Sequence, residues 1–253
     1  MHCIPRRRSL LLVPLLLLTG LAHASVQLVV DGIDDPLRAA AIDGLSLSAY
    51  RTRTVSAAQV RRLYERAPDE VRAALRPYGY YDAQTTGDVQ QTGDDWRVTL
   101  HVQPGKPVLV TTVDVTLDGD AEKIPAIRRA RRAIEQMRVK PLNDGTYDYA
   151  RDTLGAQLTA YGYLDARLTT HRVEVTRGTH SAAIHLAWKV GQRYRFGQVH
   201  FTGSQFNDGF LDRYVPFKPG DYFTQDQLLQ LQQALNGADY FSVVNVLPDV
   251  DQA

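Results

Sequence analysis

The chain has 253 residues, of which 44% are hydrophobic and 23% are charged. Its 29 basic and 28 acidic side chains nearly balance, which excludes the strongly basic character of a typical nucleic-acid-binding domain. The single cysteine, Cys3, excludes a small domain held together by disulfides, so the fold must depend on apolar packing.

Residues 1–24 have the features of a secretory signal with cleavage after Ala24. Three arginines (Arg6 to Arg8) precede an apolar run from Leu10 to Leu18, and small residues precede the predicted cut. The run is far shorter than the roughly 20 residues of a spanning helix. Ser25, not a cysteine, follows the cut, so we expect neither a membrane anchor nor a lipoprotein. The mature chain would have 26 basic and 28 acidic side chains and no cysteine.

The first predicted elements are a strand and two helices. "LVVDG" (Leu28 to Gly32) is a strand, and Asp35-Pro36 caps a short helix over Leu37 to Ile42. Ser56 starts a longer helix through a capping box, and Pro68 should kink or split it. The apolar face of this helix is predicted to contain Val60, Leu63, Tyr64, Ala67, Val71, Leu75 and Tyr78.

The long helix ends at "GYYDA", and two strands follow. Gly79 lies just past the last periodic residue, where a left-handed C-terminal cap is needed. A weakly alternating strand is predicted over Ala83 to Val89, and a strictly alternating one over Trp96 to Val102. The unit is therefore strand, helix, helix, strand, strand.

A second copy of this unit comes next. "VDVTLDG" (Val113 to Gly119) predicts its first strand, and Pro125 begins a helix that runs through Met137. A long helix ends at Gly162 in "GYLDA", a near repeat of "GYYDA". "IHLAWKV" (Ile184 to Val190) alternates, so Ile184, Leu186 and Trp188 should share one face, opposite His185 and Lys189. We also expect that at least one residue of the following set, taken from both alternating strands, is not buried: Trp96, Leu100, Ile184, Leu186 and Trp188.

The third copy is incomplete. "GQVHFTG" (Gly197 to Gly203) predicts a strand, Asn207 or Asp208 a helix cap, and "SVVNVLPDV" (Ser242 to Val250) a second strand. Its long helix is capped by Thr224, and Asp239 replaces the glycine. No third strand follows, which indicates a truncated product or a fragment. Partial exposure or loose order is therefore expected for Leu228, Leu231, Leu235, Phe241 and Val244.

This repeated βααββ unit resembles the POTRA domain of Gram-negative outer-membrane proteins. The window Gly191 to Asp221, with "GQRYRFGQVHFTGSQF" and "VPFKPGD", is similar to the TamA-like family. The resemblance implies an α+β fold of tandem POTRA domains, each a three-stranded mixed sheet packed on two helices. It places them at residues 25–107, 108–193 and 194–253. The family's C-terminal membrane β-barrel is absent from this sequence.

The resemblance also implies a function. It indicates an exported scaffold of the outer-membrane translocation and assembly module, with these domains in the periplasm. The implied partners are a TamB-like protein anchored in the inner membrane, and outer-membrane protein substrates or lipid. One alternative is the POTRA array of the main barrel-assembly machine, which binds lipoproteins. Another, from a different class, is a secreted hydrolase.

In such units the second strand is the free edge, where a partner strand can pair. In the first copy this predicts a partner-binding strand made of Ala83, Gln84, Thr85, Thr86, Gly87, Asp88 and Val89. The alternative is a solvated edge with no partner.

No catalytic or cofactor-binding motif is present in the sequence, so we expect a non-enzymatic protein without cofactor or metal. Asp34-Asp35 and Asp94-Asp95 favour a helix cap and a hairpin turn over acid–base pairs. "RRARR" (Arg128 to Arg132) favours a solvated surface over a site for anionic lipid or nucleic acid. Solvent-facing positions, not a zinc site, are favoured for His101, His171, His180, His185 and His200.

Overall fold

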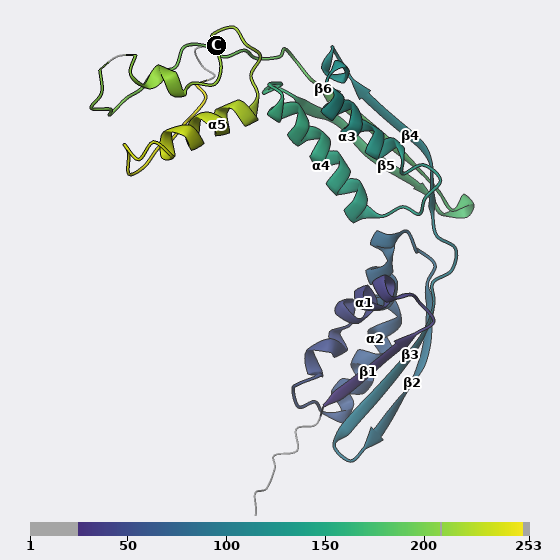
Figure 1. Ribbon diagram of the computed structural model, residues 1–253. Coiled ribbons are helices and arrows are strands. Elements are labelled where there is room, and N and C mark those ends of the chain that lie inside the picture. The colour runs from purple at the N-terminus through teal and green to yellow at the C-terminus, as the bar shows by residue number, and fades with distance from the viewer. Residues whose placement is uncertain (1–24, 208, 250–253) are drawn as a thin grey trace, which may run out of the picture.

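A computed structural model describes residues 25–207 and 209–249. The predicted signal segment, residues 1–24, lies outside this part of the chain. Figure 1 shows three units following one another along a bent, elongated molecule. We call them the first unit (residues 25–107), the second unit (108–193) and the third unit (194–249).

The first unit has the predicted βααββ order. Its strand order is β1-β3-β2, with β1 parallel and β2 antiparallel to the central strand β3. Its helices pack on one face of this sheet because their apolar residues recur at helical spacing. The elements are β1 (Val26–Asp31), α1 (Asp35–Gly44), α2 (Ala57–Leu75), β2 (Gln84–Thr92) and β3 (Asp95–Gln103).

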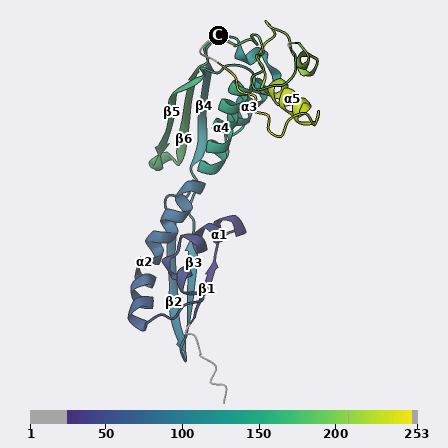
Figure 2. The same cartoon turned by 90° about the vertical axis from the view of Figure 1, so that its left-hand side faces the viewer.

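The second unit repeats this topology. Its strand order is β4-β6-β5, again with one parallel and one antiparallel neighbour of the central strand. Figure 2 shows α3 and α4 together on one face of the sheet. The elements are β4 (Leu109–Leu117), α3 (Pro125–Glu135), α4 (Asp144–Ala160), β5 (Arg167–Thr176) and β6 (Ser181–Lys189).

The predicted register of the central strands is confirmed, but one expectation about burial is wrong. Ile184, Leu186 and Trp188 face the core, while Lys189 is exposed. Trp96 and Leu100 are buried as well, so all five residues expected not to be buried together are in fact buried. The reason is that β3 and β6 are both central strands, and each turns its alternate apolar side chains toward two helices.

Helix α2 begins as predicted but is not split by its proline. The Ser56 hydroxyl accepts a hydrogen bond from the Gln59 amide at 3.3 Å. Pro68 lies inside a helix that continues unbroken to Leu75. Proline removes one backbone donor, but Ala67 before it and Val71 after it are both fully buried in the core of the unit and hold the helix in place.

The third unit lacks the strands that the sequence predicts. Within its described residues it contains α5 (Gln225–Asn236), a short 3-10 helix (Leu211–Tyr214) and a single bridge between Arg195 and Tyr222. The stretches 197–203 and 242–249 form no strand in this part of the chain, because no central strand lies between them to supply a ladder. The 3-10 helix stands where a capped short helix was predicted. Of its two candidate caps, Asp208 lies outside the described residues.

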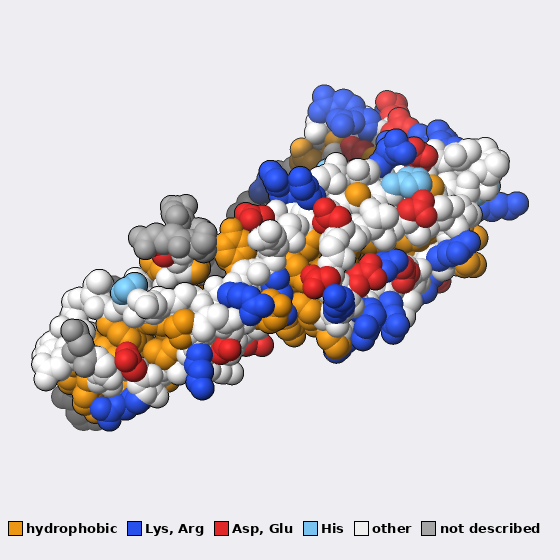
Figure 3. Space-filling model, turned by 90° about the horizontal axis from the view of Figure 1, so that it is seen from above, with side chains coloured by type: hydrophobic (Ala, Val, Ile, Leu, Met, Phe, Trp, Pro, Cys, Tyr) orange, Lys and Arg blue, Asp and Glu red, His pale blue; other side chains and the backbone are white. Residues whose placement is uncertain are grey.

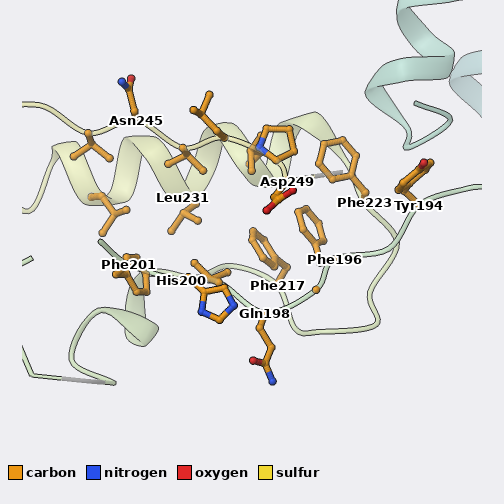
Figure 4. A pocket seen from close by; sticks show the side chains of 18 of the residues that line it. Tyr194, Phe196, Gln198, His200, Phe201, Phe217, Phe223, Leu231, Asn245 and Asp249 are labelled. Carbon is orange, nitrogen blue, oxygen red and sulfur yellow. The ribbon is translucent and has the colours of Figure 1, made fainter. Parts of the chain in front are cut away.

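An aromatic core replaces the missing sheet of the third unit. Phe196 stacks on Phe217, with ring centroids 3.6 Å apart, and Phe223 lies 5.1 Å from Phe196. Leu231 and Leu235 of α5 are buried against this cluster, so the expectation of their exposure is wrong; Leu228, Phe241 and Val244 are half-buried. An open groove of about 1110 Å³ separates the stretches 197–203 and 243–249 (Figure 4).

Candidate interaction surfaces

The predicted partner-binding residues form an edge strand. From Gln84 to Val89 they belong to β2, which pairs with β3 on one side only. Ala83 is different: it is buried, and its carbonyl accepts a hydrogen bond from Arg72 Nε at 3.3 Å. Gln84, Thr86, Gly87 and Asp88 are exposed, and Thr85 and Val89 are half-buried.

Two residues of this edge have properties that the sequence did not predict. A Cβ on Gly87 would lie 2.0 Å from the Thr99 carbonyl oxygen, so the glycine allows β2 to approach β3 closely. Within the described chain, the Thr85 hydroxyl oxygen is buried without a hydrogen-bond partner. The strand is therefore fixed on its inner side and free on its outer side.

A second candidate surface is the joint between successive units. The Gly79 carbonyl accepts a hydrogen bond from the Val108 amide at 2.9 Å, and the Val108 carbonyl accepts one from Leu142 at 2.8 Å. In the next joint the Gly162 carbonyl accepts from Tyr194 at 2.7 Å, and the Tyr194 carbonyl from Phe223 at 3.0 Å. The two joints thus repeat the same backbone connections.

Both glycines are required by the approach of the next unit as well as by their conformation. Gly79 and Gly162 have φ of 85° and 92°, which confirms the predicted left-handed caps. A Cβ would lie 2.7 Å from the Leu142 carbonyl oxygen in the first joint and 2.9 Å from that of Phe223 in the second. Any larger residue would therefore push the next unit away.

The residues after each glycine divide between the two units. Tyr163 is buried in the core of its own unit, and Tyr80 packs against the core of the first unit. Tyr81 instead packs against the core of the second unit, and Leu164 against the core of the third. The repeated motif therefore anchors one unit in the next.

The aspartate of the motif makes a polar contact across each joint. Asp82 forms an ion pair with Arg177 at the tip of the β5–β6 hairpin, and this hydrogen bond lowers the pKa of Asp82. Asp165 accepts a hydrogen bond from the Tyr194 hydroxyl at 3.1 Å, which raises the pKa of that tyrosine. The first joint therefore has a charged contact where the second has a neutral donor.

The second unit also contains a strongly shifted tyrosine beside its joint. Tyr163 donates a hydrogen bond from its hydroxyl to Asp120 Oδ1 at 2.9 Å. Burial and this bond raise the pKa of Tyr163 to about 12, and the same bond lowers the pKa of Asp120. The tyrosine is held protonated as a donor, which suits a structural role.

The third unit has an altered form of the motif. Asp239 takes the left-handed conformation, with φ of 56°, in place of the glycine. Phe241 then stands where Tyr81 and Leu164 stand in the other units, and it meets Phe206 edge-on at 5.9 Å. Tyr240 is 45% exposed. The third unit therefore has an aspartate side chain at the position where the first two units have a glycine.

The remaining polar candidates are not brought together into a site. His101 lies 2.6 Å from Asp31 and His185 lies 3.0 Å from Asp114. Among the described residues, no group of three or more His, Cys, Asp or Glu is placed to hold a metal ion. Asp34 caps α1, although its side chain makes no capping hydrogen bond.

Over the same residues, no helix combines the length and the apolar character needed to cross a membrane.

The sequence indicated the glycine caps but missed the joints. A helix cap needs only the glycine, whereas the two copies also share the next tyrosine, the aspartate and the alanine. That longer identity was the available indication of a contact beyond the helix. The role of Tyr81 in the next unit could not be inferred, because it depends on how the units are placed.

Two stretches of the chain match known family models. Residues 27–104 match the model described as "POTRA domain TamA domain 1". Residues 194–253 match the POTRA model described as "Surface antigen variable number repeat".

Solved structures with similarity to this chain include two sets of POTRA domains. POTRA3-5 of BamA from Haemophilus influenzae is 16% identical with a TM-score of 0.44, covering 88% of each chain. POTRA1-3 of the periplasmic domain of Omp85 from Anabaena is 20% identical with a TM-score of 0.33, covering 88% of this chain and 86% of that one. The assignment of POTRA domains to this chain depends on the two family matches, not on these two structures.

Proposed function

We propose that this chain, which contains POTRA domains including one of the TamA type, is a periplasmic scaffold of the Omp85 superfamily. It binds partners and substrates for outer-membrane protein assembly or autotransporter secretion, without catalysis. The observation that carries the proposal is the TamA-type match over residues 27–104, the unit that contains the free edge β2. The proposed domain boundaries are 107/108 and 193/194, between the three separate hydrophobic cores.

The partner proposed for the first unit is a TamB-like protein that spans the periplasm. It would add an extended strand to the outer side of β2, where backbone groups have no neighbouring strand among the described residues. Val89 and Thr85 point toward the helices, and the exposed Thr86 and Asp88 would contact the partner's polar face. Main-chain hydrogen bonds would supply affinity, which suits a strand with few apolar side chains.

The test removes a single backbone donor from the free edge. Thr92 and Asp95 flank a two-residue turn and should therefore form a hydrogen-bonded pair. Because such pairs alternate along an antiparallel ladder, Thr86 and His101 should form another one. Thr85 lies between two such positions, so its amide should point away from β3. Thr85→Pro is therefore expected to leave thermal stability nearly unchanged and to weaken binding to a TamB-like periplasmic segment at least tenfold. Isothermal calorimetry would measure the binding.

A matched control separates the backbone from the side chain. Thr85→Ala keeps the amide and loses the γ-methyl together with a hydroxyl that has no partner in the described chain, so its affinity should equal that of the parent. A folded Thr85→Pro variant that binds as tightly as the parent would exclude this edge as the binding site. Preferred binding to the lipoproteins of the main barrel-assembly machine would favour that alternative over the TamA-type function.

A further inference from the structure

The arginine-rich helix α3 has charges that the fold itself does not use. Arg131 is half-buried and pairs with Glu122 at 2.7 Å and with Glu135 at 3.0 Å. Both of these acidic side chains are thereby paired with Arg131. Arg128, Arg129 and Arg132 are exposed and make no ion pair within the described chain.

These three arginines share one side of the helix. Arg128 and Arg132 are four residues apart, and Arg129 and Arg132 three apart, so their side chains are neighbours. The opposite side of α3 is the buried one and contains Ile127 and Ile134. Figure 3 shows several Lys and Arg side chains at the surface of the larger, right-hand part of the molecule, with acidic side chains among them.

The segment that follows α3 presents an apolar side chain between two more cations. Val139 is 75% exposed, and its neighbours Arg138 and Lys140 are exposed as well. The backbone is fixed to β4, because Val139 donates to the Val110 carbonyl at 2.7 Å and Val110 donates to the Lys140 carbonyl at 2.9 Å. The backbone of Val139 is therefore fixed by hydrogen bonds while its side chain is exposed to solvent.

Valine is an unusual residue for this position. Its φ is 66°, a region that β-branched residues rarely adopt. The other non-glycine residues with positive φ in the described chain are His180 and Asp239, types that tolerate it better. Packing does not explain the choice of valine, because its side chain contributes nothing to the core.

We propose that α3 and the Arg138–Lys140 segment bind the surface of an anionic lipid bilayer. Five cations would face the lipid phosphates while Val139 enters the boundary between headgroups and acyl chains. A nucleic acid would use the cations but has no use for an exposed aliphatic side chain, so the valine favours lipid. This surface is independent of the β2 edge and of any partner bound there.

The charge test uses vesicles of phosphatidylglycerol mixed with phosphatidylcholine, and vesicles of phosphatidylcholine alone. Sedimentation should show binding to the anionic vesicles only, weakening as salt increases. The triple substitution Arg128→Gln, Arg129→Gln and Arg132→Gln should weaken it about a hundredfold, since each cation near such a surface contributes about fivefold. As a matched control, equal charge is removed from exposed positions of the first unit by Arg51→Gln, Arg53→Gln and Arg61→Gln, with little effect expected.

The valine test has two readouts that should move in opposite directions. Val139→Asn places a residue that tolerates positive φ, so thermal stability should rise while affinity for anionic vesicles falls several-fold. If Val139 had only a structural role, replacing it would not lower the affinity for vesicles.

The proposal is overturned by absence of binding to anionic vesicles or by an equal loss in the control triple variant. Unchanged affinity of Val139→Asn, or tighter binding to a single-stranded oligonucleotide than to vesicles, would overturn it as well.

Discussion

Gly79 and Gly162 each satisfy two requirements with one residue. Each ends a helix in the left-handed conformation, and each leaves room for a carbonyl oxygen of the next unit. Gly119 is a natural comparison, because its φ is 81° and a Cβ there would meet no atom within 4 Å. The difference between these positions separates the conformational requirement from the contact.

At this scale we predict that Gly79→Ala destabilises the chain more than Gly119→Ala does. Gly119→Ala should lower the free energy of unfolding by about 1–2 kcal/mol, the usual cost of a left-handed L-residue. Gly79→Ala should lose more and should also shift the second unit, since its Cβ meets the Leu142 carbonyl oxygen. Denaturant unfolding and spin-label distances between the units measure the two effects. Equal losses with unchanged distances would contradict the assigned contact.

The difference between the units is clearest at the level of the strands. β3 and β6 are each paired on both sides, whereas the stretches 197–203 and 242–249 of the third unit belong to no ladder among the described residues. The apolar cluster around Phe196 still buries Leu231 and Leu235, so α5 is packed without a sheet. Packing and pairing are therefore separate contributions in this unit.

Hydrogen exchange should reveal this separation. Strong amide protection is expected in residues 96–101 and 184–188, which are paired on both sides, and weak protection in 197–203 and 242–249. The amides of α5 should be intermediate, because helical hydrogen bonds are local and the helix is packed on one side. Protection in residues 197–203 as strong as in β3 would contradict the absence of a ladder there.

Across the whole molecule, one ion pair, between Asp82 and Arg177, connects the first unit to the second. Arg177 lowers the pKa of Asp82 below its ordinary value of 3.8. A carboxylate with a lowered pKa stabilises the folded arrangement fully above its unfolded pKa, and this contribution is lost as the pH falls through the folded value. The first joint should therefore loosen in acid, whereas the corresponding aspartate of the second joint, Asp165, contacts the neutral Tyr194 hydroxyl.

We predict that the distance distribution between spin labels in the first and second units broadens below about pH 4. Asp82→Asn should already be broad at pH 7 and should show no further change in acid, and Arg177→Gln should behave in the same way. The distance between the second and third units serves as an internal reference. If Asp82→Asn remained as narrow as the parent at pH 7, the ion pair would have no part in fixing the bend.

The sequence by itself determined the elements that depend on local pattern. The apolar spacing from Val60 to Leu75, the alternation around Leu186 and the left-handed conformation of Gly162 all follow from rules acting within a few residues. The tertiary structure alone decided what depends on neighbours distant in the chain. Tyr81 belongs to the core of the next unit, and residues 197–203 form no strand, because a joint and a ladder both need a partner that local pattern does not specify.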